Sequence, residues 1–435
     1  MKSKMPNTRL DNVLAQLDAL VNWERRDRSQ GMRRGLDPVL DVLRRLGNPE
    51  ARFRVVHVTG TKGKGTTSAL VAATLSKRGL RTGLYTSPHV DRVNERVRVD
   101  GLDVEDEVLA HALERAFAAR EAAIAENTAG DEATWFDLIT AAAFLVFAEA
   151  GCAWAVVECG IGGRLDSTNA AFGEVCVVTN VDLEHTNVLG NTRAEIAREK
   201  GGILKKGSTL VTSLWPDPQL GRDDDAGSVL EGLAWELGCL VLRPPHVSPT
   251  MLERNADLAR LVLDELGRRG VRGANGALIT SAALDRATLG SALLPARLER
   301  RRVGGTQVVI DGAHVASSVR MVLEELAQDP ALHGKPVVVL ALGRDKDAGA
   351  ILKTLRERAD RLVCTTVVSG PLRAVEPLVE EASRAGFVAE TAADPKSALA
   401  KAIPLAGDEG WVLVIGSFYL AGAVRAFLAD PSKDA

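Results

Sequence analysis

The sequence has few aromatic residues, almost no net charge and no long apolar run. Only 4% of its 435 residues are Phe, Trp or Tyr, so it offers little surface on which nucleic acid bases could stack. Fifty-four Lys and Arg against 57 Asp and Glu leave a formal net charge of −3, which provides no bulk attraction for nucleic acid or for an anionic membrane. We therefore expect neither nucleic acid nor a membrane as a partner.

Segments that would direct the chain out of the cytoplasm are also missing. The longest apolar run, residues 138–147, is too short to span a bilayer and lies between Asp137 and Glu149. Residues 1–10 are polar and contain no apolar core of a signal peptide. The five cysteines are odd in number and form no C-x-x-C pair, which is typical of reduced thiols and argues against a thiolate metal site. The sequence therefore predicts a cytoplasmic protein.

The sequence does contain enough apolar material for two packed domains. Hydrophobic residues make up 46% and charged residues 26%, which is ordinary for a globular protein, and the length exceeds that of a typical single domain. Apolar β-branched runs alternate with helical patterns, and their unbroken apolarity indicates a parallel sheet covered on both faces. In the first part of the chain we expect strands at 55–58, 155–157, 175–178 and 209–212, and helices at 67–78 and from Thr192, where Thr192 and Glu195 form a capping box.

The same alternation restarts after Arg297, and the polar stretch 216–227 is expected to be an exposed loop. In the second part we expect strands at 308–310, 337–342, 361–365 and 411–415, and helices at 316–328, 348–358, 372–385 and 418–428. The sequence thus predicts an α/β fold with a parallel-sheet N-terminal domain, residues 1–295, and a smaller Rossmann-like α/β C-terminal domain, residues 296–435.

The strongest local motif is a glycine-rich turn, G-T-K-G-K-G-T-T, at residues 60–67. It lies between a predicted strand and a predicted helix, where backbone N–H groups and the helix N-terminus can bind phosphate. The spacing departs from G-x-x-x-x-G-K-[ST], because Gly65 stands where a hydroxyl residue would follow the lysine. A glycine-rich turn with exposed lysines is the alternative. We predict that the N-terminal domain contains a P-loop, whose nucleotide-binding residues are Gly60, Thr61, Gly63, Lys64, Gly65 and Thr66.

Polar side chains that could bind a metal follow other predicted strands. Glu158 ends a buried strand, His185 follows the strand 175–178, and Ser87 stands in a turn after a short strand. Because the carboxyl ends of parallel strands meet at one edge of a sheet, we expect these side chains near Lys64. Glu158 is a candidate Mg²⁺ ligand, and Ser87 could reach the same ion. The alternatives are a connecting loop, a structural histidine and a turn serine.

Three further polar residues stand at the ends of elements. Lys200 closes a helix, where a cation also favours the helix C-terminus for purely structural reasons. Asp311 and His314 follow the strand 308–310 and suggest a second ligand-binding edge, in the C-terminal domain. No Ser-His-Asp triad can be located in the sequence.

Eight motifs, in this order, closely resemble those of the folylpolyglutamate synthase/dihydrofolate synthase family of the Mur ligase superfamily. They are G-T-K-G-K-G-T-T, Y-T-S-P-H, V-E-C-G-I-G-G-R-L-D-S-T-N, E-H-T, E-K-G-G-I, P-A-R-L-E, D-G-A-H and G-S-F-Y. The resemblance implies a monomeric ATP-dependent ligase acting between its two domains. ATP would phosphorylate the carboxylate of dihydropteroate, of tetrahydrofolate or of both, and the amino group of L-glutamate would displace phosphate from the acyl phosphate.

The resemblance also assigns roles to residues of this sequence. It implies that Lys64, Glu158, His185 and Lys200 are catalytic, and that Ser87, Glu158, His185 and Lys200 hold one or two Mg²⁺ ions, with Lys200 carbamylated. It adds Asn255, Arg297, Asp311 and His314 to the ATP-binding residues. The pterin-binding residues would be Thr134, Trp135, Phe136, Asp137, Leu165, Asp166 and Ser167.

Two departures from the family pattern leave other functions open. His314 is followed by Val315 and Ala316 where the family has Asn-Pro, and the link between Leu240 and Asn255 lacks a few tens of residues that the family normally carries. A paralogous Mur-type amide ligase with a different acid or amine therefore remains an alternative. From another class of protein, the alternative is a P-loop nucleotide-binding regulatory protein.

Overall fold

The computed structural model describes residues 8–22, 35–217, 219–292, 294–368, 370–407 and 410–428. The chain forms two compact units: unit 1 comprises residues 1–89 and 93–292, and unit 2 comprises residues 90–92 and 293–435. The change of unit after residue 292 lies just before the domain boundary that we placed at 295/296. Of the polar segment 1–10, residues 1–7 lie outside the described residues.

Unit 1 is built on an eight-stranded sheet with the strand order β4-β3-β2-β5-β1-β6-β7-β8. The run from β2 to β8 is parallel. Strands β5 and β7 are buried at every position, which explains why unbroken apolarity predicted them. The strands are β1 (Arg54–Thr59), β2 (Thr82–Tyr85), β3 (Val97–Val99), β4 (Leu102–Asp103), β5 (Trp154–Glu158), β6 (Gly173–Val178), β7 (Thr209–Thr212) and β8 (Leu240–Leu242).

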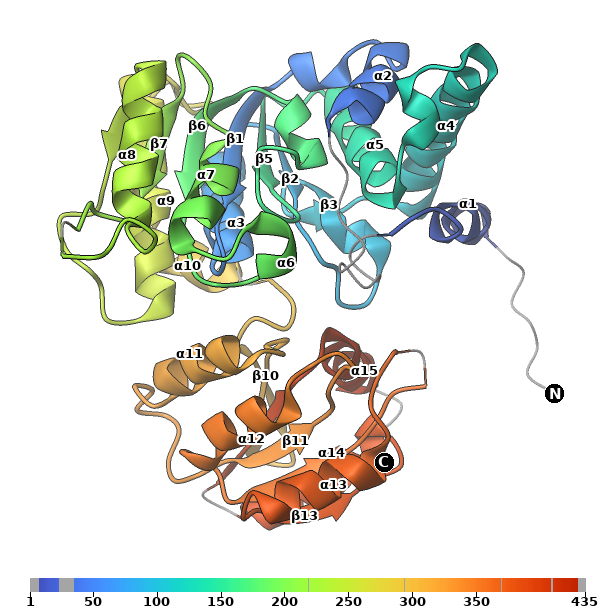
Figure 1. Ribbon diagram of the computed structural model, residues 1–435, viewed down its shortest axis with the longest axis vertical. Helices are drawn as coiled ribbons and strands as arrows, with labels where there is room; N and C mark the ends of the chain where they lie inside the picture. Colours follow the sequence, from blue (N-terminus) through green and yellow to red (C-terminus); the bar gives the residue numbers. More distant parts are fainter. Residues whose placement is uncertain are drawn as a thin grey trace. The chain divides into compact units, whose positions relative to one another are not determined.

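Helices cover both faces of this sheet (Figure 1). Helices α3 and α9 pack on each other and on one face, whereas α1, α2, α4 and α5 form a hydrophobic layer with the other. Helix α7 begins at the predicted capping box, in which Thr192 Oγ1 accepts a hydrogen bond from Glu195 N at 3.1 Å. The helices are α1 (Arg9–Asp18), α2 (Asp37–Arg45), α3 (Lys64–Lys77), α4 (Asp106–Glu126), α5 (Trp135–Glu149), α6 (Thr186–Leu189), α7 (Arg193–Gly201), α8 (Ala226–Leu237), α9 (Met251–Arg268) and α10 (Arg286–Ser291).

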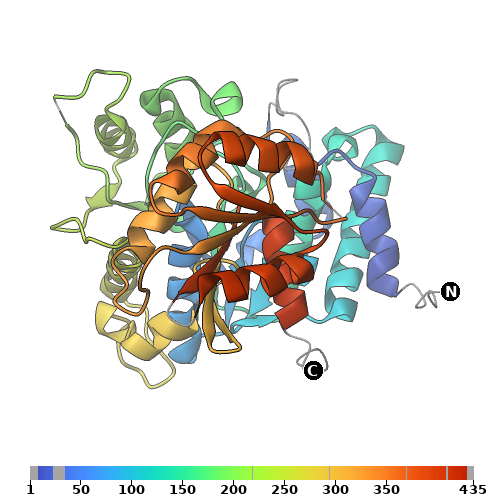
Figure 2. The same cartoon turned by 90° about the horizontal axis from the view of Figure 1, so that it is seen from below.

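Unit 2 has a six-stranded sheet with the order β13-β12-β11-β14-β10-β9. Helices α11, α12 and α13 pack on one face, and α14 and α15 on the other (Figure 2). The strands are β9 (Glu299–Val303), β10 (Thr306–Ile310), β11 (Val337–Leu340), β12 (Arg361–Cys364), β13 (Val388–Thr391) and β14 (Trp411–Ile415), and the helices are α11 (Ala316–Leu326), α12 (Ala348–Arg356), α13 (Val375–Arg384), α14 (Pro395–Ala406) and α15 (Phe418–Leu428). The two-domain α/β fold predicted from the sequence is confirmed.

Three strands, β3 and β4 at one side of the first sheet and β9 at the edge of the second, pair antiparallel, which we did not predict. β3 pairs with β2 and β4 pairs with β3 in unit 1, and β9 pairs with β10 in unit 2. Two of these connections are two-residue turns in which both residues have positive φ: Asp100 (51°) with Gly101 (83°), and Gly304 (55°) with Gly305 (91°). Such turns match the twist of paired strands and favour Asp-Gly and Gly-Gly. These two dipeptides were therefore the sequence signal for the hairpins.

The structure shows the conformation of two segments that the sequence singled out, 216–227 and 138–147. The stretch 216–227 is not an exposed loop throughout: Asp225 is buried and caps α8, which begins at the buried Ala226, and Pro218 lies outside the described residues. The apolar run 138–147 lies within α5. In the part of the chain that the structure describes, no helix combines the length and apolarity needed to cross a bilayer.

Candidate active site

The glycine-rich turn leads from the end of β1 into the first residue of α3, Lys64. Gly63 has a φ of 82°, and a Cβ atom there would lie 2.2 Å from Oδ1 of Asn255 on α9, so glycine is required on both counts. Lys64 Nζ donates to the carbonyl oxygens of Gly60 at 3.1 Å and Thr61 at 3.5 Å. The ammonium group therefore lies over the loop, at a helix N-terminus that can bind phosphate.

The remaining predicted P-loop residues lie inside the same loop and helix. Gly65 is buried and Thr66 half-buried, both in the first turn of α3. Asn255 is 5% exposed, and its Oδ1 lies 3.5 Å from Thr67 Oγ1. The structure thus brings Asn255 to the P-loop, as the resemblance implied, although the two are far apart in the sequence.

A clamp that we did not predict holds this loop from β6. Asn180 Oδ1 accepts hydrogen bonds from Thr61 N at 3.1 Å and from Lys62 N at 2.8 Å. The hydroxyl group of Thr179 donates to Lys62 O at 2.5 Å. Because β6 pairs with β1, its end lies beside the loop. An asparagine two residues after a buried strand was the available signal.

Glu158 ends β5, the other neighbour of β1, and only 3% of its surface is exposed. Its Oε2 accepts a hydrogen bond from Ser87 N at 3.0 Å. Ser87 is 8% exposed and follows β2, which pairs with β5. The structure therefore brings together these two predicted metal ligands at the carboxyl ends of neighbouring strands.

His185 lies at the start of α6 with a φ of 54°, next to Glu184. Lys62 Nζ forms an ion pair with Glu184 Oε1 at 2.8 Å. Burial raises the pKa of Glu184, but Lys62, His185 and Lys64 more than offset this, and its pKa is lowered overall. Lys62, which we had not singled out, thus already has a carboxylate partner within the protein.

Lys200 lies near the end of α7 and is only 4% exposed. No hydrogen bond or ion pair to its Nζ is found among the described residues. Burial, aided by the positive charges of Lys64 and Lys62, lowers the pKa of Lys200 to about 7. A Cβ atom at Gly163 would lie 2.7 Å from the carbonyl oxygen of Lys200, so this glycine allows the 160–170 loop (residues 160 to 170) to pack against α7.

The donors at this site suit a magnesium ion, which water and substrate phosphates also bind, better than a metal ion whose ligands all come from the protein. Within the described residues, no three His, Cys, Asp or Glu side chains are arranged to hold a metal ion. The buried carboxylate of Glu158 beside Ser87 nevertheless provides oxygen donors. Mg²⁺ is usually held by one or two carboxylates together with water and substrate phosphates, so this donor set is suitable for it.

The residues assigned to the pterin form one hydrogen-bonded group at the start of α5. Asp137 Oδ2 accepts from Thr134 N at 2.8 Å and from Thr134 Oγ1 at 2.7 Å, and its Oδ1 accepts from Ser167 Oγ at 2.6 Å. Trp135 is 1% exposed, and its Nε1 donates to Asp18 at 3.0 Å. Trp135 is therefore part of the core.

Phe136 and Leu165 remain half-buried beside this group. Phe136 lies 6.1 Å from the Tyr85 ring, and a Cβ atom at Gly160 would lie 2.7 Å from the Phe136 ring. Gly160 therefore lets the 160–170 loop approach an aromatic side chain closely, which is the kind of surface that a flat heteroaromatic ligand requires.

Asp166 is turned into its own loop. Its Oδ2 accepts from Ile161 N at 3.0 Å and its Oδ1 from Thr168 N at 3.1 Å, and only 6% of the residue is exposed. Burial raises the pKa of Asp166, although these hydrogen bonds act against the rise. Asp166 therefore shapes the 160–170 loop from inside.

In unit 2, the predicted residues surround Phe418. The Arg297 guanidinium lies 4.5 Å from the centre of the Phe418 ring, and the His314 ring lies 5.7 Å from it, edge-on. A Cβ atom at Gly312 would lie 2.1 Å from the same ring. Asp311 accepts hydrogen bonds from the Leu298 and Ala313 amides at 2.9 and 2.8 Å, which holds the Arg297 segment beside β10. Phe418 belongs to the G-S-F-Y motif of the resemblance, but it had been given no role.

Comparison with known proteins places the chain among amide ligases. Residues 296–418 match the family profile described as "Mur ligase, glutamate ligase domain". The chain is 32% identical to a folylpolyglutamate synthase of Lacticaseibacillus casei, over 90% of this chain and 93% of that protein. It is 34% identical to a probable bifunctional folylpolyglutamate synthase/dihydropteroate synthase of Haloferax volcanii, over 90% of this chain but only 48% of that longer protein.

Solved structures agree in fold. A Mycobacterium tuberculosis folylpolyglutamate synthase complexed with ADP matches with a TM-score of 0.81 and 25% identity, over 97% of this chain and 98% of that one. A bifunctional folylpolyglutamate synthase/dihydrofolate synthase of Yersinia pestis, complexed with AMPPNP and a Mn ion, matches with a TM-score of 0.77 and 27% identity, over 99% of this chain and all of that one.

Proposed function

Since the chain belongs to the folylpolyglutamate synthase/dihydrofolate synthase family of ATP-dependent ligases, we propose that it joins L-glutamate to a pterin acid. The observation that carries the proposal is the pairing of β1 with β5, which places the end of the P-loop strand beside the buried Glu158. A phosphate-binding loop next to a buried carboxylate is suited to phosphoryl transfer, in which positioning and electrostatic stabilisation supply most of the catalysis.

In this proposal the P-loop binds the phosphates of ATP and Lys64 stabilises negative charge on the transferred group. Lys64 is suited to this role because, among the described residues, its ammonium group donates hydrogen bonds to backbone carbonyl groups and to no side chain. The acid carboxylate attacks the γ-phosphorus and ADP leaves; the amino group of glutamate then attacks the acyl carbon, loses a proton and displaces phosphate. In this proposal Asn255 contacts the nucleotide from α9.

We further assign Ser87, Glu158 and His185 to Mg²⁺, which when bound neutralises charge on the phosphates. The buried Glu158 is the strongest donor of this set. The pterin acid would lie against the half-buried Phe136 and Leu165, in the segments 134–137 and 165–167 that Asp137 and Ser167 hold together.

Lys200 is proposed to carry a carbamate. Its buried Nζ has no partner among the described residues, and an amine with a pKa near 7 is partly neutral and nucleophilic at physiological pH. Nζ would attack the carbon of CO₂, form an N–C bond and lose a proton, and the resulting anion could hold a second metal ion. In ¹³C-bicarbonate we expect one carbamate signal by NMR. The signal should be lost in Lys200→Arg. It should be kept in the control Lys206→Arg, since Lys206 is an exposed lysine nearby. Absence of the signal in the unchanged protein would contradict this assignment.

The proposed activity is tested by phosphate release from ATP with the full chain. We expect release with dihydropteroate or tetrahydrofolate only when L-glutamate is present, together with a product that is heavier by one glutamyl residue in mass spectrometry. No release with either pterin would exclude the proposal. Release with another acid or amine would instead support the paralogous ligase, and binding of nucleotide without any ligation would support a regulatory protein.

A further inference from the structure

One face of β1 is hydrogen-bonded to the 160–170 loop. His57 and Thr59 are two residues apart, so their side chains lie on the same face of the strand. Thr59 Oγ1 donates to Gly162 O at 2.5 Å, and His57 Nε2 lies 2.9 Å from Thr168 Oγ1. The two contacts attach both ends of the loop to the strand that leads directly into the P-loop at Gly60.

The hydrogen-bonding partners determine which ring nitrogen of His57 carries the proton. The Thr168 hydroxyl group donates to the carboxylate of Asp166, so it can only accept from His57, and Nε2–H is the donor. Cys159 Sγ, at the start of the loop, lies 3.1 Å from the same nitrogen. His57 thus contacts both flanks of the 160–170 loop through Nε2, and it is a neutral imidazole because burial lowers its pKa to about 3.

A histidine at position 57 lowers folding stability, and packing does not explain why this residue is present. His57 is completely buried between Val56 and Val58, in a strand where an apolar side chain would fit the surroundings. Its Nδ1 has no hydrogen-bond partner within the described part of the chain. An unpaired buried nitrogen lowers stability. A histidine can form the polar contact with Thr168, whereas a valine could not.

The loop can transmit a displacement at these contacts to the proposed pterin site. Asp166 accepts hydrogen bonds from the Ile161 and Thr168 amides, which close the loop on itself. Ser167 in turn holds Asp137 of α5 at 2.6 Å. A shift at Thr168 therefore displaces residues 165–167 relative to the P-loop.

We propose that His57 and Thr59 are positioning residues, which hold the acid-binding 160–170 loop in register with the P-loop so that the acid carboxylate faces the γ-phosphate of ATP. The proposal rests on the proposed function for the identity of the acid. The placement of the loop does not depend on the proposed function, because the hydrogen bonds are present within unit 1 itself. Misplacement of reacting groups by about 1 Å can lower a rate by about 100-fold.

The kinetic test uses Thr59→Val and His57→Leu, which remove the two donors. We expect kcat/KM for the pterin acid to fall about tenfold or more, and KM for ATP to stay within about twofold, because the P-loop keeps its clamp from β6. The conservative variants Thr59→Ser and His57→Gln should retain much of the activity. Thr212→Val is the matched control: Thr212 is also a buried threonine that ends a strand, and its hydroxyl group donates to Val178 O at 2.8 Å, away from the loop.

Amide hydrogen exchange of the unliganded full chain is the second measurement, and it needs no substrate. Faster exchange confined to residues 160–170 is expected in Thr59→Val and His57→Leu, and no change there in Thr212→Val. Unchanged exchange in this loop would overturn the proposal, as would an equal loss of affinity for ATP and acid. If the unchanged protein ligates no pterin acid, the proposed function fails while exchange still decides the positioning role.

Discussion

Replacing Lys64 with alanine is expected to lower kcat for glutamate ligation by about 100- to 1,000-fold, the range found when one preorganised donor to a developing charge is removed. No ion pair between Lys64 and a carboxylate is found among the described residues, where its Nζ donates only to the backbone of the P-loop. Lys62, two residues earlier, is instead paired with Glu184. The free positive charge of the loop is therefore that of Lys64, and a bound phosphate is its natural partner.

Lys64→Ala could also lose activity because it unfolds more easily, so its stability is measured beside its activity. Lys77→Ala is the matched control, because Lys77 lies on the same helix but pairs with Asp285 at the surface. We expect both variants to unfold at nearly the same urea concentration as the unchanged protein, and only Lys64→Ala to lose ligation, measured as glutamate-dependent phosphate release. A Lys64→Ala protein with an unchanged kcat would show that the loop does not act on the transferred phosphate.

The elements that the sequence predicted best are those whose side chains have a similar environment along the whole element. Strand β7 and helix α15 have the predicted bounds, 209–212 and 418–428. Strand β7 could be recognised because a strand buried on both faces is continuously apolar. Strand β13 was missed because it is a half-exposed edge strand. Helix α14 was also missed, although Asp394 and Pro395 at its start are recognisable helix-start residues.

For the site, motifs next to strand ends could be found, but contacts between distant segments could not. Lys64, Glu158 and Ser87 were predicted because parallel strands bring their carboxyl ends to one edge. The clamp from Asn180 and the contact of His57 with Thr168 join segments more than 100 residues apart in the chain. Their partners are set by strand order and by loop conformation, neither of which is encoded in local sequence patterns.

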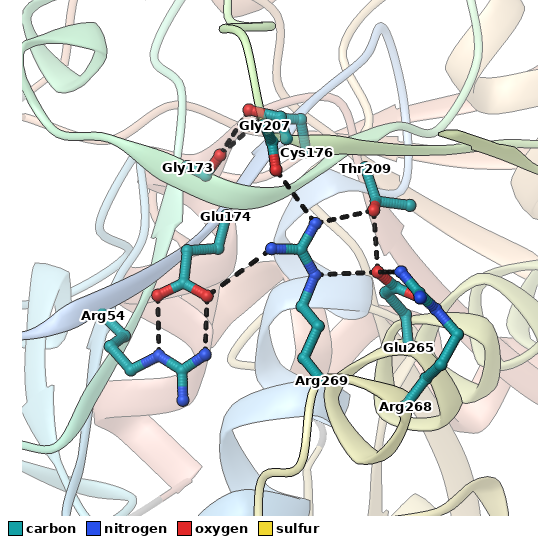
Figure 3. A network of polar contacts seen from close by, with 10 residues as sticks. Arg54, Gly173, Glu174, Cys176, Gly207, Thr209, Glu265, Arg268 and Arg269 are labelled. Carbon is teal, nitrogen blue, oxygen red and sulfur yellow. Dashed lines mark hydrogen bonds and ion pairs between the residues drawn. The ribbon is translucent and has the colours of Figure 1, made fainter. Parts of the chain in front are cut away.

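Glu265 is the centre of a buried ionic network at the end of α9 (Figure 3). Its carboxylate accepts hydrogen bonds from Arg268 Nε at 2.5 Å, from Arg269 Nε at 2.7 Å and from Thr209 Oγ1 at 2.7 Å. Arg269 also reaches Gly207 O at 3.1 Å and so ties α9 to the start of β7. Burial raises the pKa of Glu265, but the arginine and threonine hydrogen bonds outweigh burial and lower it to about 2.

Replacing Glu265 with glutamine is expected to lower the free energy of unfolding of unit 1 by about 3 kcal/mol at pH 7. A pKa that is lower in the folded than in the unfolded chain stabilises the fold above the unfolded pKa, at about 1.4 kcal/mol per unit. This contribution is complete above about pH 5 and is lost as the pH falls towards 2. The difference between the two proteins should therefore shrink to about 1 kcal/mol at pH 3.

The Glu265→Gln measurement is urea unfolding followed by tryptophan fluorescence, since Trp411 is the only one of the six tryptophans that belongs to unit 2. Glu236→Gln is the control, because Glu236 is an exposed glutamate on α8 and its loss should change stability by less than about 0.5 kcal/mol. A Glu265→Gln difference that stays constant between pH 7 and pH 3 would mean that the glutamine side chain disturbs packing. A difference that falls with pH assigns the stabilisation to the ionised carboxylate, which joins α9 to β7 on the side of unit 1 from which Asn255 reaches the P-loop.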